Sequence, residues 1–206
     1  MVYQVRHSKY GDIGSYTNTV QENADRTTVN TQGHIKVSIL GVPAYRQDFD
    51  RTEHWKGARL VSFHGETTEN GKKTELDGIA EGDHFTLVAP AGTATAPMDV
   101  RPANPWSDKM LTGDTILMPD QGHVERVAVT GGETVPLMVN GHSVATRHYR
   151  IQRPDPQKRY ELWFDGDGVP VRFADISPKE TITFNLSQCE GAAVCPLLRD
   201  QTIAQR

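Results

Sequence analysis

Residues 159–173, RYELWFDGDGVPVRF, place the tetrad Asp-Gly-Asp-Gly between two apolar stretches. The tetrad is either a metal-binding loop or a turn of the chain. An EF-hand calcium loop that began at Asp165 would need oxygen ligands at its fifth and twelfth places. Those places hold Val169 and Ile176, whose side chains carry no oxygen. The calcium-loop pattern therefore fails.

The residues of the same stretch are the types that a turn requires. Gly166 and Gly168 permit positive φ, and aspartate side chains in turns bond to nearby backbone amides. Pro170 suits an edge strand or a bulge after the bend. The stretch therefore predicts a β-hairpin between residues 160–164 and 169–173.

Turn signals of this kind recur at short, fairly even intervals, and segments rich in Val, Ile, Thr, Phe and Tyr lie between them. Apolar residues alternate clearly at 181–186, TITFNL. The dipeptide Asn70-Gly71 is typical of a type I′ hairpin turn. No stretch of a dozen residues has a convincing helical period, and the best short helix candidate is 104–111, NPWSDKML. The sequence predicts an all-β antiparallel meander with at most one or two short helices.

One segment, residues 88–105, interrupts this rhythm with Pro, Ala and Gly. Strand patterns resume on both sides of it, so we interpret it as a long crossing loop inside one domain. A chain of 206 residues is long enough for one large β domain. We expect a single domain over residues 1–187 and a C-terminal tail over residues 188–206.

Charge and hydropathy argue against two classes of protein. Twenty-two Lys and Arg against 26 Asp and Glu give a formal net charge of -4, and the basic residues form no dense cluster. Nucleic-acid binding is therefore not expected. The purely apolar runs are far shorter than the ~20 residues that span a bilayer, so no membrane-spanning segment is expected. No phosphate-binding loop is present, and we expect no cofactor.

The eight histidines form no recognisable metal motif, because neither His-Glu-x-x-His nor a zinc-finger spacing occurs. His123 and Glu125 would share one face of a strand, and His54 and His64 flank a turn across which they would approach each other. Pairs of this kind are common on protein surfaces. No Gly-x-Ser-x-Gly elbow occurs either. We expect no metal site and assign no catalytic residue.

Acidic residues concentrate in 46–55, RQDFDRTEHW. In a strand, Asp48 and Asp50 face one side while Glu53 and Trp55 face the other. Paired carboxylates serve glycosidases only when both face a cleft, which spacing alone does not establish. We expect this stretch to be a charged edge strand protected from aggregation.

The three tryptophans, Trp55, Trp106 and Trp163, each lie beside a turn or a proline. We expect them to cap the ends of a barrel core, and the alternative is that they line an apolar cavity. Cys189 and Cys195 flank a five-residue Gly/Ala-rich gap that can close into a disulfide. Two free thiols are the alternative.

Residues 1–10, MVYQVRHSKY, begin directly in a strand-like pattern, with no charged and apolar leader ahead of it. We expect either a cytoplasmic protein or a periplasmic or otherwise exported one whose signal has been removed.

Four segments occur in an order and spacing that resemble an uncharacterised, mostly exported bacterial family of unknown function. They are residues 3–20, 53–71, 104–111 and 160–173. The family-like positions within them are Gly11, Ile13, Gly14, Glu53, Trp55, Gly57, Leu60, Asn70, Gly71, Trp106, Leu162, Trp163, Asp165 and Gly168. The likeness covers residue 3 to about residue 187.

That family looks like a distant relative of exported open-barrel or β-spiral proteins, similar in outline to periplasmic lipoprotein carriers and to an envelope-integrity protein. The resemblance implies one strongly curved antiparallel sheet around an apolar cavity. It also implies a non-enzymatic exported protein that holds an apolar or lipid-like ligand or supports the cell envelope, with an envelope protein as a potential partner. The residues expected to contact a ligand are Trp55, Trp106, Trp163, Glu53 and His7.

The alternative is a small β-barrel enzyme of the isomerase or cyclase type, which uses a histidine and a carboxylate as acid and base on an apolar substrate. It requires a histidine that faces the cavity beside a carboxylate with a perturbed pKa. The candidates are His7, His54, His64 and His123.

Overall fold

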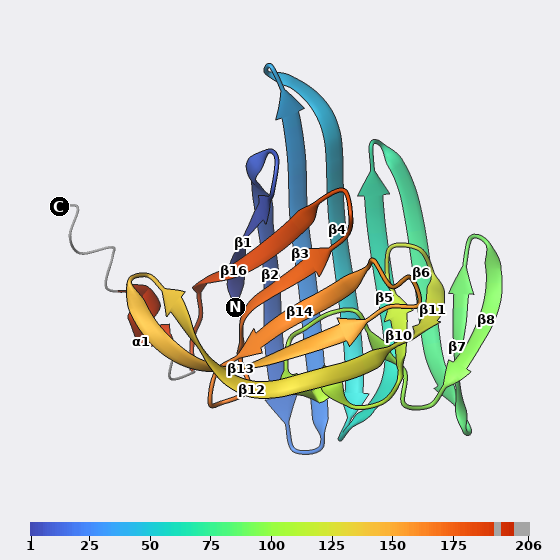
Figure 1. Cartoon of the computed structure of the whole chain (residues 1–206). Helices are drawn as coiled ribbons and strands as arrows, with labels where there is room; N and C mark the ends of the chain where they lie inside the picture. Colours follow the sequence, from blue (N-terminus) through green and yellow to red (C-terminus); the bar gives the residue numbers. More distant parts are fainter. Residues whose placement is uncertain (192–194, 200–206) are drawn as a thin grey trace.

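The computed structural model describes residues 1–191 and 195–199 and is an all-β protein built on one sheet of 13 antiparallel strands (Figure 1). Residues 192–194 and 200–206, which belong to the expected tail, lie outside the described part. The sheet strands are β1 (Val2–His7), β2 (Gly11–Asn23), β3 (Arg26–Ile39), β4 (Val42–Lys56), β5 (Arg59–Glu69), β6 (Lys72–Glu81), β7 (His84–Ala89), β8 (Gly92–Pro97), β12 (Ala128–Val139), β13 (His142–Gln152), β14 (Arg159–Phe164), β15 (Pro170–Ile176) and β16 (Thr181–Gln188).

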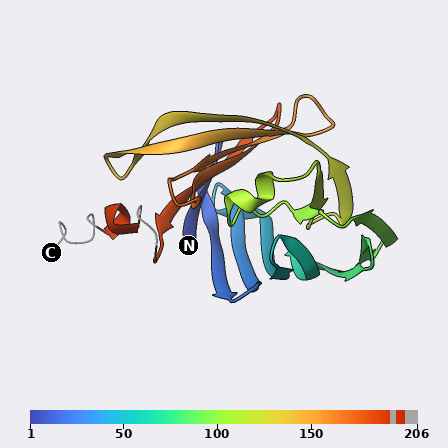
Figure 2. The same cartoon turned by 90° about the horizontal axis from the view of Figure 1, so that it is seen from below.

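The sheet consists of two meanders joined through the N-terminal strand. Strands β1 to β8 follow one another in space, as do β12 to β16, and β1 pairs with both β2 and β16. The sheet curves so strongly that the two meanders face each other, as Figure 2 shows. Within the described residues the edge strands β8 and β12 do not pair, so the barrel is open.

The chain between the two edge strands enters the concave side. We call residues 98–127 the plug; it contains β9 (Arg101–Pro102), the 3-10 helix η1 (Asp108–Leu111), β10 (Thr115–Met118) and β11 (His123–Arg126). The three plug strands form a small separate sheet. In Figure 2 this segment lies between the two meanders. The interior of the barrel is therefore largely filled by the protein's own chain.

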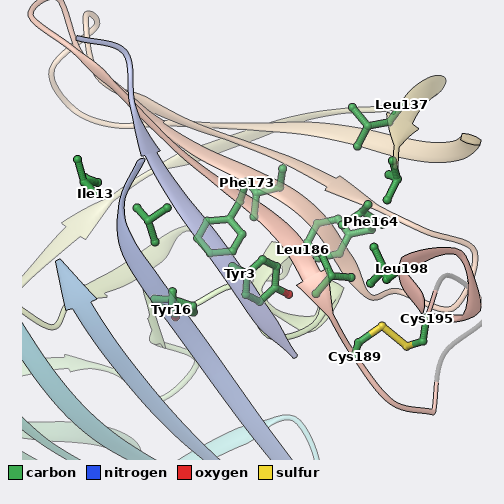
Figure 3. Close-up of a cluster of buried hydrophobic side chains, with 14 of the residues drawn as sticks. Tyr3, Ile13, Tyr16, Leu137, Phe164, Phe173, Leu186, Cys189, Cys195 and Leu198 are labelled. Carbon is green, nitrogen blue, oxygen red and sulfur yellow. A yellow bond between two sulfur atoms is a disulfide. The ribbon is translucent and has the colours of Figure 1, made fainter. Parts of the chain in front are cut away.

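Two separate clusters of buried apolar side chains pack with residues of the plug. One includes Tyr3, Phe164 and Phe173 and extends to the short helix α1 (Cys195–Arg199) (Figure 3). The other includes Trp55 and Phe85 together with plug residues. Cys189 is joined to Cys195 by a disulfide, which holds α1 beside the end of β16.

The hairpin predicted around the Asp-Gly-Asp-Gly tetrad is confirmed, since β14 and β15 pair antiparallel across it. Asp165 caps the turn: its Oδ1 accepts hydrogen bonds from the backbone N–H groups of Asp167 at 3.0 Å and Val169 at 2.9 Å. Only one of the two glycines uses positive φ, since Gly168 has φ 78° and Gly166 does not. The type I′ turn at residues 70–71 is also confirmed, with φ of 49° and 85°.

Three local predictions are wrong. The expected crossing loop at 88–105 contains β8, which pairs with β7, and the crossing begins only after it. The helix expected over 104–111 is limited to η1, because Trp106 is buried in the core ahead of it. The charged stretch 46–55 is no edge strand, since β4 lies between β3 and β5; its outward carboxylates pair with neighbours, as Asp48 does with Arg46 at 2.6 Å.

Among the described residues, no helix has the length and apolar character needed to cross a membrane.

Candidate functional site

A fully buried carboxylate lies where the plug meets the sheet. Glu53 on β4 is 0% exposed, and three N–H groups donate to it. Trp55 Nε1 and Trp106 Nε1 donate to Oε2 at 2.9 and 3.2 Å, and Asn104 Nδ2 donates to Oε1 at 2.6 Å. Two of these donors belong to the plug, so the carboxylate fastens the plug to the sheet. We call these four residues the Glu53 cluster.

Further hydrogen bonds extend the Glu53 cluster toward β2 and β3. Asn104 Oδ1 accepts from the hydroxyl of Tyr16 and, at 3.1 Å, from Asn18 Nδ2. The Thr31 hydroxyl accepts from Asn104 Nδ2 at 2.9 Å and donates to Asn18 Oδ1 at 2.7 Å. Each of the donor groups in this hydrogen-bond network meets an acceptor. Buried polar groups that are paired in this way do not carry a large free-energy cost.

Burial raises the pKa of Glu53 to about 7, because desolvation penalises the ionised form. The three N–H donors and the nearby Arg51 cation oppose this shift, and the hydrogen bond from Asn104 lowers the pKa most. The arrangement therefore favours a structural role, in which the carboxylate gathers hydrogen-bond donors from distant parts of the chain.

A cavity of about 200 Å³, partly open to solvent, lies beside this cluster, between the two meanders and the plug. Aromatic and aliphatic side chains form most of its wall, and a few polar groups interrupt them. The residues that line it are Ile13, Tyr16, Ile35, Tyr45, Gln47, Phe49, Arg51, Ala103, Pro105, Met118, Pro119, Asp120, Tyr160, Leu162, Phe173, Ala174, Asp175, Ile182 and Phe184.

Arg51 is the only cationic side chain that the described residues contribute to that wall. It is 4% exposed, its guanidinium lies 4.0 Å from the centre of the Phe49 ring, and its Nη2 donates to Asp120 Oδ1. Its Nε is buried and has no hydrogen-bond partner among the described residues. Asp175 also lines the cavity, and burial raises the pKa of its carboxyl.

A larger groove of about 750 Å³ opens near the start of the chain, and polar and apolar groups line it in similar measure. It lies between β2 and the turn at 165–168, and Trp106 forms part of its wall.

The structure brings together three of the five residues expected to contact a ligand, Glu53, Trp55 and Trp106. Trp163 lies on the outer face, because its neighbours in β14 point inward, and it stacks on His148 with ring centroids 4.6 Å apart. His7 is buried and bonds to Glu180 at 3.1 Å. None of the five is among the residues that line the 200 Å³ cavity.

The histidines expected for acid–base chemistry lie away from this cavity as well. His54 and His64 are exposed on the outer face of the sheet, where His64 bonds to Asp77 at 2.8 Å. His123 and Glu125 share one face of β11, as predicted. His123 Nε2 lies 3.0 Å from Glu125 Oε1.

Glu125 belongs to a salt bridge at the rim of the plug. Arg153 donates to its two carboxylate oxygens at 2.8 and 2.7 Å, and this pairing lowers the pKa of Glu125 to about 2. The outer face carries one group of three potential metal ligands among the described residues, His64, Glu75 and Asp77, all exposed. Exposed clusters of this kind are ordinary surface features.

The sequence analysis did not identify Arg51 as a cavity residue, although the alternation of residues along β4 places it on the inward face. Arg51, Glu53 and Trp55 occupy alternate positions of β4, so they share its inward face. An arginine at an inward position of a long strand indicates a buried cation that needs a partner.

The model of a protein family described as a domain of unknown function, DUF6134, matches residues 3–187. The chain belongs to the DUF6134 family. The fold of this DUF6134 protein is similar to that of a beta-barrel-like protein of the DUF1849 family from Brucella abortus. The two chains are 11% identical, the match covers 89% of this chain and 93% of the other, and the TM-score is 0.65.

A DUF1089 family protein from Pseudomonas aeruginosa is a weaker match, with a TM-score of 0.40, 12% identity, and coverage of 76% of this chain and 87% of the other. No curated protein sequence matches the DUF6134 chain. The family model establishes the family, and the similarity to the DUF1849 protein establishes the barrel-like fold.

Proposed function

We propose that this DUF6134 protein holds a small apolar or lipid-like molecule in the 200 Å³ cavity, without covalent chemistry. The observation that supports the proposal is the composition of the cavity wall, which is mostly apolar and has few polar groups at defined points. Sites for small ligands usually have this character.

The size of the cavity limits the ligand. An apolar cavity of about 150 Å³ holds a benzene-sized molecule, whereas drug-sized ligands need about 300 Å³ or more. A cavity of about 200 Å³ therefore suits a short alkyl chain or a single ring. A longer lipid would place only part of its chain inside.

No histidine lines the cavity in the described part of the chain, so nothing in its wall favours histidine acid–base catalysis over binding. Binding alone requires no such group.

The proposal includes an exported location, periplasmic or otherwise in the cell envelope. The disulfide between Cys189 and Cys195 supports this location, because structural disulfides persist in oxidising compartments. Among the described residues, strands β8 and β12 each pair on one side only, and their outer edges offer backbone groups through which an envelope partner would add a strand. Fractionation of the native host, with the protein detected by antiserum, tests the location; recovery with the cytosol would contradict it.

Solvent extraction and native mass spectrometry of protein purified from its own host test the binding proposal. We expect a bound apolar molecule, and we expect an apolar fluorescent probe to compete with it. The substitution Ala103→Leu places extra apolar atoms in the cavity wall and should weaken probe binding. Ala94→Leu adds the same atoms at an exposed site on β8 and should leave binding unchanged. Equal effects of the two substitutions would refute the site.

A further inference from the structure

The Arg51 guanidinium has more hydrogen-bonding capacity than the protein uses. An arginine carries five N–H donors and keeps its charge at all physiological pH values. Arg51 is 4% exposed, its Nε–H has no partner, and its one protein acceptor among the described residues is Asp120. Leaving charged donors unpaired in a buried site is costly.

Arg51 forms part of the wall of the 200 Å³ cavity. The guanidinium lies over Phe49, and both side chains form part of the cavity wall. A ligand that enters the cavity therefore meets a cation with free donors beside an apolar surface. Such a combination recognises a molecule with a hydrocarbon body and an anionic head.

We propose that the cavity binds a short-chain monocarboxylate, with its alkyl chain against the aromatic wall and its carboxylate on the Arg51 guanidinium. This inference rests on the proposed function and specifies the class of ligand. The guanidinium N–H groups that do not bond to Asp120 supply charge-assisted hydrogen bonds to the ligand oxygens. When the cavity is empty, the Asp120 carboxylate accepts the hydrogen bond from Arg51 Nη2.

Three carboxyl groups, two near Arg51 and one elsewhere in the cavity wall, bear on the charge balance. Glu53 is satisfied by its own three N–H donors, so it does not depend on Arg51 for a partner. Asp120 is 45% exposed and can be hydrated when a ligand takes its place. Burial raises the pKa of Asp175, which reduces the repulsion that this group exerts on an anion.

Hexanoate and 1-hexanol are a matched pair of probes, because they share the alkyl chain and differ in the charged head. Titration calorimetry gives the affinity of the full-length protein for each probe, and nitrogen–proton correlation spectra report the Arg51 Nε–H directly. We expect hexanoate to bind about tenfold more tightly than hexanol, as a hydrogen bond to a charged group implies. We also expect hexanoate to shift the Nε–H resonance.

Two substitutions with opposite expected effects separate head-group recognition from general stability. Arg51→Met keeps an apolar side chain of similar length against Phe49 and should lower hexanoate affinity about tenfold or more, with hexanol unchanged. Asp120→Asn removes the competing anion from a half-exposed position and should raise hexanoate affinity several-fold. If Arg51→Met does not fold, the rise in hexanoate affinity with Asp120→Asn still tests whether the ligand carboxylate binds Arg51.

The results distinguish this inference from the proposed function. Equal binding of hexanoate and hexanol, with Asp120→Asn inert, would overturn the carboxylate head group and leave an apolar site. Binding of neither probe would overturn the carboxylate inference. The proposed function would then be judged by the apolar fluorescent probe and its response to Ala103→Leu.

Discussion

Replacing Glu53 with glutamine should change how the stability of the protein depends on pH. Glu53 is completely buried, and its pKa rises from an ordinary 4.5 to about 7. Between these pH values the unfolded chain has lost the Glu53 proton while the folded chain keeps it. The unfolded state then binds fewer protons, so the free energy of unfolding falls as pH rises through this window.

The size of the effect follows from the pKa change. Each factor of ten in proton affinity corresponds to about 1.4 kcal/mol, so full ionisation costs the folded state about 3 kcal/mol by pH 8. Glutamine does not titrate and removes this cost. We expect the stability of Glu53→Gln relative to the native protein to increase by about 3 kcal/mol between pH 4 and pH 8. Other carboxyl groups titrate in both proteins and cancel from the comparison.

Urea unfolding at a series of pH values measures this difference, and the fluorescence of Trp55 and Trp106 reports the loss of the cluster. Glu75→Gln is the matched control, because it makes the same chemical change at an exposed position on the outer face. Its difference from the native protein should be small and flat with pH. A flat difference for Glu53→Gln as well would show that the three N–H donors fully compensate for burial and would refute the raised pKa.

Three further predictions test local features of the fold. Leu40 is 100% exposed with φ 51°, and Leu40→Asn should raise the free energy of unfolding by about 1 kcal/mol in urea, because asparagine tolerates this conformation; no gain would contradict strain at this turn. Gly168→Ala should cost about 1–2 kcal/mol, since φ is 78°, whereas Gly166→Ala should be close to neutral; equal costs would refute the assignment of the turn. Replacing Cys189 and Cys195 together with alanine opens a short loop and should lower stability by about 2 kcal/mol in thermal unfolding, and an unchanged midpoint would show that the disulfide is dispensable.

The strands and hairpins could be predicted because their signals are local. The type I′ turn at residues 70–71 and the hairpin around Asp165 depend on residues within a few positions of each other. The pairing of β1 with β16 has no such signal, since it joins residues at opposite ends of the chain, such as Val5 and Phe184. This pairing fuses the two meanders into one sheet. Only the resemblance to a family of curved-sheet proteins indicated that the two meanders form one sheet.

The candidate site depends on contacts of the same long-range kind. Alternation along β4 predicts that Glu53 and Trp55 face the same side, and a buried carboxylate must have donors. The identity of the donors has no such local signal. Asn104 and Trp106 lie 51 and 53 residues farther along the chain, where the sequence predicts the end of a loop and a short helix. The turn of the plug into the barrel places these donors at Glu53 and leaves Arg51 facing the remaining space. Buried charge at inward strand positions therefore indicates that some distant segment must enter the concave side, and the structure identifies that segment as the plug.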